Sequence, residues 1–591
     1  MKKFFEKHDL IKISLIMILL TLVLTWAIPQ GYFNAGELVE SEITRIGIFD
    51  FFTYGLLGMY YFTVLVTFLF VLGGFYQFLS SIEAYQKLTS SIAKKIKGKE
   101  IIFSLVISYL LAVLASMVNE YYILIAFLPF IITILSKAKL DKISIFASTF
   151  GSLLVGVIGS IISSKIVGMN VTYFGLKYSD NMIERIILFI IAFTVYSVFN
   201  ALHISKSLKN TAKEEKVEDL FENSDSKDEK NSIIPIIIVG IIAIITVLLA
   251  YLPWKDVFQV EWFTNAYNWV TSVKVFNVPI FSYILGNVSE FGAWDIFGVQ
   301  IVMLLSVLVL KLCYKKSFND VIESFGTGFK KTSKLVVILL LAYIVLEFTV
   351  MYPVIPTIIS KILGSTFNIA TTTISGIITG LFTSEYQYTA NILYSFFTTN
   401  YANDLNVVAL ILQSTFGLVS FVAPTSAILF IGLSYLDIPY KDWIKHIWKF
   451  LLIMLGAIIL VSLLTIYGID KLTKISFVVL MILIGICSVA LIISLVALWK
   501  IFKKAGRHGW EAIIPFYNIY VLFKVVGLPG LSCLLLLIPI VNIAVMVYVY
   551  VKLAKAFGKS DLFTVGLIFL DVIFMMIIAF DKSKYTLKKN K

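Results

Sequence analysis

The sequence predicts an all-α polytopic membrane protein made of two inverted repeats, each with a re-entrant hairpin and a broken helix, followed by an appended helical membrane domain. The 591 residues are 59% hydrophobic and only 14% charged, with a mean hydropathy of +0.93. A soluble core cannot bury so much apolar surface, and the apolar runs approach the ~20 residues that cross a bilayer. Two polar landmarks inside these runs recur at nearly the same spacing.

These landmarks indicate an internal duplication. The tetrapeptide Ser-Thr-Phe-Gly begins at Ser148 and again at Ser414, an offset of 414 − 148 = 266. A glutamate in apolar sequence occurs at Glu120 and again at Glu385, an offset of 385 − 120 = 265. The shared register favours a duplication over chance matches in a chain rich in Ser, Phe and Gly. Duplicated membrane halves with polar breaks at mid-bilayer depth are typical of secondary transporters.

The first half, residues 1–204, is expected to begin with a spanning helix over 10–28. This run lacks a small-residue cleavage site, so it is not a removable signal. A second span over 54–79 leads to a lysine-rich loop, which the positive-inside bias assigns to the cytoplasm.

The next unit predicts a re-entrant hairpin. Asn119 and Glu120 separate apolar runs over 101–118 and 121–136, and basic loops flank the unit on both sides. One full crossing cannot have both ends in the cytoplasm, whereas a hairpin with Asn119 and Glu120 at its tip can. Polar, non-helical backbone at membrane depth is tolerated only inside protein or beside a watery cavity.

The remaining first-half spans are expected over 143–164 and 183–201, the former interrupted by glycines and Ser160. Residues 205–232 are charged and of mixed sign, which predicts a disordered cytoplasmic linker.

The second half, residues 233–470, repeats this order. Spans are expected over 233–252, 294–312 and 335–351, with a lysine-rich loop before the last. A second hairpin over 367–397 has Ser384 and Glu385 at its tip, and its weakly charged flanks assign it to the outside. The two hairpins therefore enter from opposite sides, which is the polarity of an inverted repeat.

The span expected over 406–435 is broken at Pro424, which cannot donate a backbone hydrogen bond. Freed carbonyls and neighbouring hydroxyls can replace the hydration shell of Na⁺, while a half-helix N-terminus favours an anionic group. Under the 266 offset, Ser160 matches Ser426 and Gly159 matches Thr425. The alternative is a packing kink in each helix. The predicted ion-binding residues are Gly159, Ser160, Pro424 and Thr425.

Glu120 and Glu385 are the sharpest functional candidates. A carboxylate within a span costs about 2.5–3.5 kcal/mol, so it indicates a site by default. Each could bind a substrate ammonium, hold a proton or pair with a cation; the alternative is a loop residue exposed to headgroups. Glu347 is a third intramembrane candidate. The predicted substrate-binding residues are Asn119, Glu120, Ser160, Ser384, Glu385, Thr425 and Ser426.

Composition also excludes several classes. The net charge of +13 comes from lysines in short loops, as expected of membrane topology rather than nucleic-acid binding. The three cysteines are far apart, and neither a phosphate-binding loop nor a metal-ligand spacing occurs. We therefore expect neither an enzyme nor a cofactor, apart from a coupling Na⁺ or H⁺.

Several motifs resemble a known family. Ala423-Pro424-Thr425-Ser426, the Pro-Tyr-x-x-Trp of Pro439 to Trp443, the Asn119-Glu120 tip followed by Pro129, and the Gly73-Gly74 step resemble the YfcC / C4-dicarboxylate anaerobic carrier family over about residues 10–467. The resemblance implies an elevator-type secondary transporter of the ion transporter superfamily. It also implies a homodimer in the bacterial plasma membrane that carries dicarboxylates, amino acids or peptides.

The chain departs from that family's pattern at three points. Phe421 stands where the family has Asn, Asn119 stands where it has an acid, and the Asn-Pro of the first broken helix is absent. These departures motivate an alternative, a transport-inactive scaffold or sensor acting through the C-terminal domain.

That domain, residues 475–591, resembles an uncharacterised small membrane domain appended to various bacterial membrane proteins. The resemblance rests on the stretch from Lys504 to Trp510, on Ile514 to Asn518 and on Phe557 to Lys559. It implies no known activity.

The residues favour a secondary active transporter working by ion-coupled or exchange alternating access. Intramembrane carboxylates suit a cationic or zwitterionic ligand, and half-helix N-termini suit a carboxylate. An amino acid satisfies both requirements, so it is the first expectation, with a peptide or a dicarboxylate as alternatives.

Overall fold

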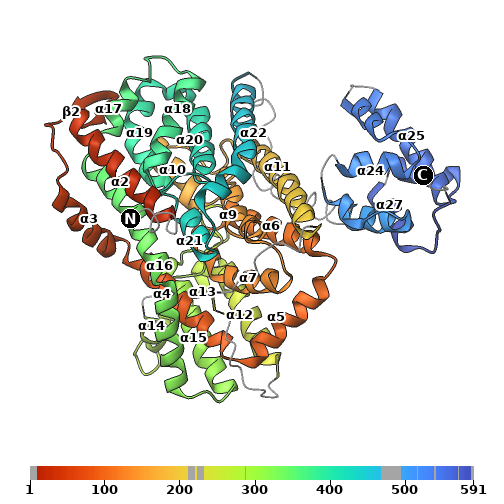
Figure 1. Ribbon diagram of the computed structural model, residues 1–591, viewed down its shortest axis with the longest axis horizontal. Coiled ribbons are helices and arrows are strands. Elements are labelled where there is room, and N and C mark those ends of the chain that lie inside the picture. The colour runs from red at the N-terminus through yellow and green to blue at the C-terminus, as the bar shows by residue number, and fades with distance from the viewer. Residues whose placement is uncertain are drawn as a thin grey trace. The chain divides into compact units, whose positions relative to one another are not determined.

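The computed structural model describes residues 9–209, 220–221, 232–286, 288–467, 494–514, 517–537, 541–569 and 571–586. The chain divides into two compact units, Met1–Thr473 and Lys474–Lys591, each with a hydrophobic core of its own. Almost every element is a helix (Figure 1). The predicted all-α polytopic membrane fold is confirmed.

Nine helices among the described residues are long and apolar enough to cross a membrane. They are α2 (Asp9–Ala27), α4 (Thr63–Ser80), α6 (Glu100–Met117), α11 (Met182–Lys209), α12 (Ile234–Tyr251), α15 (Ile296–Cys313), α16 (Phe318–Met351), α20 (Leu405–Val419) and α22 (Tyr440–Tyr467).

Shorter helices lie between these spans. They are α3 (Ile48–Tyr61), α5 (Glu83–Ile96), η1 (Tyr121–Phe127), α7 (Leu128–Lys137), α8 (Lys142–Ser148), α9 (Phe150–Ile158), η2 (Ser164–Gly168), α10 (Met169–Phe174), α13 (Trp262–Ser272), α14 (Ile280–Leu285), α17 (Ile355–Ser360), α18 (Ile369–Phe382), α19 (Tyr386–Asn400), η3 (Ala402–Asp404) and α21 (Ala427–Tyr435). Together with α6 and α20, these shorter helices flank the two predicted hairpin tips and the two predicted breaks.

Among the described residues, one two-stranded sheet interrupts the helical pattern. Strands β1 (Gly31–Asn34) and β2 (Glu37–Glu40) pair antiparallel in the loop that follows α2. Ala35 and Gly36 join them at φ 46° and 82°. Two left-handed residues form the turn whose twist matches a two-residue hairpin, which explains why the loop closes here.

Several helices in the first unit extend beyond the predicted spans. The expected span over 54–79 is α3 and α4, which are interrupted at Phe62, and the lysine-rich loop after it is the helix α5. Helix α16 begins at Phe318, well before the predicted start at residue 335, because Ser317 and Asp320 form a capping box there. The spans were predicted from apolar runs alone, so the helical residues in charged segments next to those runs were missed.

Helices α4 and α16 pack with their backbones nearly in contact. A side chain at Gly328 would place its Cβ 2.3 Å from the Gly73 carbonyl. Small residues allow this close approach in membrane helices, where packing replaces the hydrophobic effect as the driving force. The Gly73-Gly74 step is therefore a helix-packing feature.

The charged linker begins later than predicted, because α11 continues to Lys209. Its residues 210–219 and 222–231 lie outside the described residues, and the expectation of disorder there is untested. Between them, Phe221 is buried, with its ring centroid 6.0 Å from Tyr76 and 5.9 Å from Tyr435.

The second unit contains a helix over 494–504 and six further elements. They are η5 (Gly509–Ala512), α24 (Tyr517–Val525), η6 (Gly530–Leu537), α25 (Val541–Ala556), α26 (Asp561–Phe569) and α27 (Asp571–Phe580). Its core includes Ile501, Val521, Leu553 and Ile578, which are all fully buried.

Candidate functional site

Each predicted hairpin turns at its glutamate. Helix α6 ends before Glu120, which has φ −135° and ψ 97° and starts η1. Helix α18 ends before Glu385, which has φ −136° and ψ 146° and starts α19. The two acids therefore occupy the same position in their hairpins, at the extended residue just before the returning helix.

The two glutamates meet at a lysine that the sequence analysis did not single out. Lys165 Nζ lies 3.1 Å from Glu120 Oε2 and 3.1 Å from Glu385 Oε2. The three side chains are largely buried: Lys165 is 25% exposed, Glu120 14% and Glu385 13%. We call Glu120, Lys165 and Glu385 the tip triad. The signal for Lys165 was present, because a lysine within an apolar segment is as unusual as a glutamate.

Lys165 follows directly after the break in the first broken helix. Helix α9 ends at Ile158, and η2 begins at Ser164. Between them the N–H groups of Ile161, Ile162 and Ser163 converge on the Ser116 carbonyl oxygen, at 2.9, 3.0 and 3.2 Å. This unwound segment is therefore fixed to the stem of the first hairpin.

Two predicted residues lie within that break. Gly159 has no room for a side chain, because an added Cβ would lie 2.4 Å from the Phe189 Cα. Ser160 is fully buried, and its Oγ has no hydrogen-bond partner among the described residues; the same holds for the Oγ of Ser163. A buried hydroxyl without a partner in the protein is a candidate ligand group.

Two carbonyls freed at the second broken helix accept hydrogen bonds from side chains. Helix α20 ends at Val419 and α21 begins at Ala427. Trp443 Nε1 donates to the Phe421 carbonyl at 2.9 Å, and the Tyr440 hydroxyl donates to the Val422 carbonyl. The Pro-Tyr-x-x-Trp motif therefore supplies the donors that the break at Pro424 requires.

Thr425 connects this break to the second hairpin. Its Oγ1 lies 3.1 Å from the Leu381 carbonyl and 3.2 Å from the Thr383 carbonyl, at the end of α18. Ser426 is buried at the N-cap of α21. At the hairpin tip, Ser384 Oγ is buried without a hydrogen-bond partner among the described residues.

Asn119 positions the triad instead of facing it. Its Oδ1 accepts from Ser164 Oγ at 2.6 Å, next to Lys165, and its Nδ2 donates to the Gly292 carbonyl at 2.5 Å. Its backbone N–H donates to the Tyr251 carbonyl at 2.8 Å. Helix α12 and the loop after it therefore hold the first tip in place.

A buried polar chain links the two halves beside the triad. The Tyr386 hydroxyl donates to Asn170 Oδ1 at 2.6 Å, and Asn170 Nδ2 donates to Gln413 Oε1 at 2.9 Å. Gln413 Nε2 then donates to the Ser160 carbonyl at 3.3 Å. These residues could not be predicted from the sequence, since polar side chains in apolar runs give no sign of which partner they will meet.

Glu347 lies outside the tip triad. It is buried in α16 at 6% exposure, and no ion pair to it occurs among the described residues. A separate cavity of about 300 Å³ is lined by apolar side chains of α4, α5, α12 and α15, including Phe75, Leu88 and Met303. It has no charged lining group, so it does not suit a carboxylate. The described residues contain no cluster of His, Cys, Asp and Glu suited to a metal ion.

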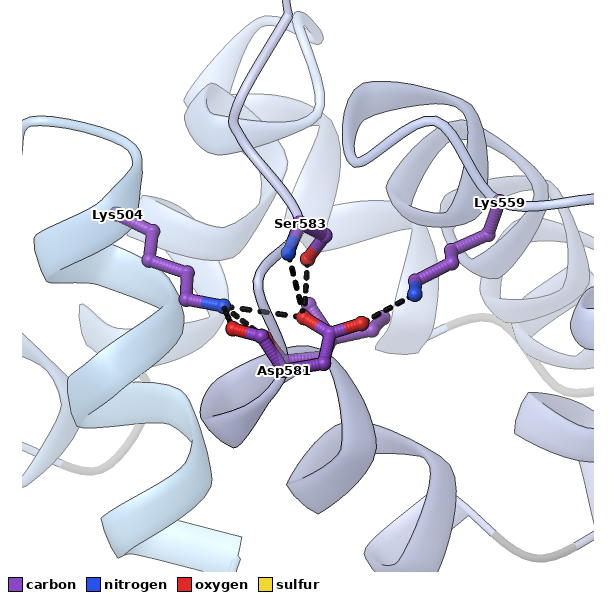
Figure 2. A network of polar contacts seen from close by, with 5 residues as sticks. Lys504, Lys559, Asp581 and Ser583 are labelled. Carbon is purple, nitrogen blue, oxygen red and sulfur yellow. Dashed lines mark hydrogen bonds and ion pairs between the residues drawn. The ribbon is translucent and has the colours of Figure 1, made fainter.

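The second unit has a polar cluster of its own. Figure 2 shows Asp581 between two lysines: Lys504 Nζ lies 2.7 Å from its carbonyl oxygen and 3.1 Å from its Oδ1, and Lys559 pairs with its Oδ2. The N–H of Ser583 donates to Oδ1 at 3.0 Å. These contacts join the ends of three segments of the unit, so we interpret the cluster as structural.

Helical hairpins that meet at two broken helices in a polytopic fold define the class of secondary transporters. The sequence profile of the C4-dicarboxylate anaerobic carrier family matches residues 8–470, and that of a family of unknown function (DUF5684) matches residues 510–588. The chain belongs to the C4-dicarboxylate anaerobic carrier family. Both predicted resemblances are confirmed.

Two further comparisons add little. No curated protein matches the chain. Among solved structures, the YdaH transporter of Alcanivorax borkumensis is similar at 12% identity and a TM-score of 0.34, over 78% of this chain and 98% of that one. With a TM-score this low, the family match and the chain's own helices carry the assignment. The protein is a multi-pass plasma-membrane carrier of the carboxylate type.

Proposed function

We propose that the protein is a secondary active transporter that moves a small zwitterionic carboxylate, an amino acid or a short peptide, by alternating access at the tip triad. The observation that carries the proposal is one ammonium held between two carboxylates from opposite hairpins. Such a group of charges can exchange partners with a ligand that contains both an ammonium and a carboxylate.

Charge balance supports a zwitterion over a dicarboxylate. With all three side chains ionised, the triad has a net charge of −1. A zwitterion leaves that value unchanged, whereas a dianion takes it to −3 unless two cations accompany it. Because unpaired buried charge is strongly unfavourable, the dicarboxylate would need additional coupling ions.

Buried hydroxyls close to Lys165 and Glu385 in the sequence support a carboxylate end on the ligand. Ser160, Ser163 and Ser384 each have a buried Oγ without a partner among the described residues. Buried hydroxyls are normally satisfied, so a ligand carboxylate would complete these three donors. Its ammonium would pair with Glu120 or Glu385 as Lys165 turns to the carboxylate.

Ligand-dependent thermal stabilisation of the purified protein tests this function. A ligand adds RT ln(1 + [L]/Kd) to stability, so a millimolar binder registers at high concentration. We expect amino acids to raise the melting temperature more than dicarboxylates at equal concentration. Uptake of the best binder into proteoliposomes then measures transport.

Two variants sharpen the test. Glu385→Gln should weaken binding about tenfold or more, since a hydrogen bond to a charged group contributes about 1.5–3 kcal/mol. Glu37→Gln, at an exposed position of β2, is the matched control and should bind as the wild type does. Equal stabilisation by succinate and by its amino-substituted analogue would reject the zwitterion preference.

The second candidate function is a transport-inactive scaffold or sensor. The departures from the family pattern favour this hypothesis. The side chain of Phe421, at the expected Asn position, packs against Trp443 and Phe450 with centroids 6.4 and 5.2 Å away. It therefore provides no polar group at the second break. A folded protein that responds to no member of the ligand panel would favour this candidate.

A further inference from the structure

We propose that the Lys165 ammonium is a tethered cation that takes the place of a coupling ion, so that the protein binds its substrate without Na⁺. This inference rests on the proposed function of the same site. It assigns to Lys165 the role that the sequence analysis gave to a free Na⁺ at the broken helices.

Lys165 occupies the position that a cation between the two hairpin tips would take. Lys165 Nζ is equidistant, at 3.1 Å, from carboxylate oxygens contributed by both hairpin tips. Two carboxylates from opposite hairpins are the strongest cation ligands in this part of the fold, and the lysine already neutralises one of them. A second cation between the same two oxygens would be repelled by the ammonium.

Several backbone oxygens at or beside the breaks already accept hydrogen bonds. The Ser116 carbonyl accepts three N–H groups, the Ser160 carbonyl accepts from Gln413, and the Phe421 carbonyl accepts from Trp443. These are the oxygens that would replace the hydration shell of an ion in a broken-helix site. Protein donors already occupy these three oxygens, which leaves them less suited to a bare cation.

The two halves of the predicted repeat differ at the position of Lys165. Under the 266 offset, 165 + 266 = 431, and residue 431 is the buried Ile431 of α21. At this position of the predicted repeat, the first half therefore has a charged side chain and the second half has an apolar one. One lysine between two carboxylates gives a single tethered cation, and an ammonium has three donors, of which two serve the glutamates and one is left for a ligand carboxylate.

The test is the melting temperature of the substrate-free protein, with NaCl replacing choline chloride at constant ionic strength. We expect no change for the wild type. In Lys165→Ala the two carboxylates lose their partner, and Na⁺ or ethylammonium should raise the melting temperature by about 2 °C or more. Lys165→Arg should behave as the wild type does, because it keeps the charge.

Lys177→Ala is the matched control, since Lys177 is exposed and lies in the loop after α10; it should gain no response to either cation. A saturable Na⁺ stabilisation of the wild type would overturn the inference. So would a folded Lys165→Ala protein that neither cation stabilises. If Lys165→Ala does not fold, the wild-type titration decides alone.

These readings need no substrate, which separates them from the proposed function. A protein that ignores every carboxylate on the panel would contradict transport. The cation response of Lys165→Ala would still report whether Lys165 occupies a cation site.

Discussion

Single hydrogen bonds to freed backbone carbonyls stabilise the breaks in the helices of this membrane protein. Trp443 is fully buried, and its indole N–H is the donor to the Phe421 carbonyl at 2.9 Å. Helix backbone that loses its own pairing inside a membrane must find another partner. The Pro-Tyr-x-x-Trp motif, by which the sequence resembles the family, thus supplies a hydrogen-bond donor to the broken helix.

Trp443→Phe should therefore destabilise the protein by about 1–3 kcal/mol, because it leaves a buried carbonyl without its donor. Trp448→Phe is the control on the same helix, since Trp448 is 47% exposed. Unfolding of both variants in detergent gives the comparison. Equal stability of the two would show that the carbonyl has another partner.

Asp141, in the loop between α7 and α8, gives a prediction on pH. Burial raises the pKa of this carboxyl, but hydrogen bonds from His203, at 3.0 Å, and from Ser144 outweigh it and lower the pKa to about 2. A depressed pKa in the folded state contributes stability above the unfolded value near ~3.9, and this stability is lost as pH falls toward 2.

Asp141→Asn should accordingly cost about 2 kcal/mol at pH 5–7, and the difference from the wild type should shrink below pH 4. Thermal unfolding of both proteins from below pH 4 to pH 7 measures this stability difference. Asp442→Asn, with a side chain that is 51% exposed, should follow the wild type throughout. A gap that does not change with pH would contradict the assignment.

Among the elements, the two broken helices touch at a glycine. An added Cβ on Gly417 would lie 2.5 Å from the Ile158 Cα and 2.6 Å from its N, so α20 meets the end of α9 backbone to backbone. Gly417 closes the second copy of the repeated tetrapeptide. The repetition itself stays a prediction, but its second glycine has a clear packing reason.

Gly417→Ala should destabilise the protein by about 1–3 kcal/mol, because the contacted backbone cannot move aside cheaply. Gly456→Ala in α22 is the control, since nothing lies within 4 Å of its added Cβ. That substitution should stabilise by about 0.5–1 kcal/mol through helix propensity. Ligand binding and unfolding of each variant can be compared directly.

Most of these elements could be predicted from the sequence, but the contacts between elements that are distant in the sequence could not. Apolar runs fixed the spans, and polar interruptions marked the tips and breaks near Glu120, Glu385 and Pro424. The Asn170–Tyr386 bond joins residues 216 positions apart. Such pairs exist only in the fold, whereas Lys165 could have been found by applying to lysine the rule used for glutamate.

Across the whole molecule, the two units have separate cores, and only the first contains the tip triad. A chain ending at Thr473 should therefore keep the ligand-dependent rise in melting temperature of the full protein. Loss of that response in a folded, truncated protein would favour the scaffold or sensor reading. The homodimer implied by the resemblance is a further expectation, which the mass of the detergent-solubilised protein would test.

The carbonyl oxygen of Ser116 has a mechanical consequence. Because it holds Ile161, Ile162 and Ser163 together, the segment that presents Lys165 is tied to the first hairpin. We therefore expect Glu120 and Lys165 to move together during any opening of the site. The contact predicted to separate is that of Lys165 with Glu385, so an arriving substrate would meet the Glu385 carboxylate first.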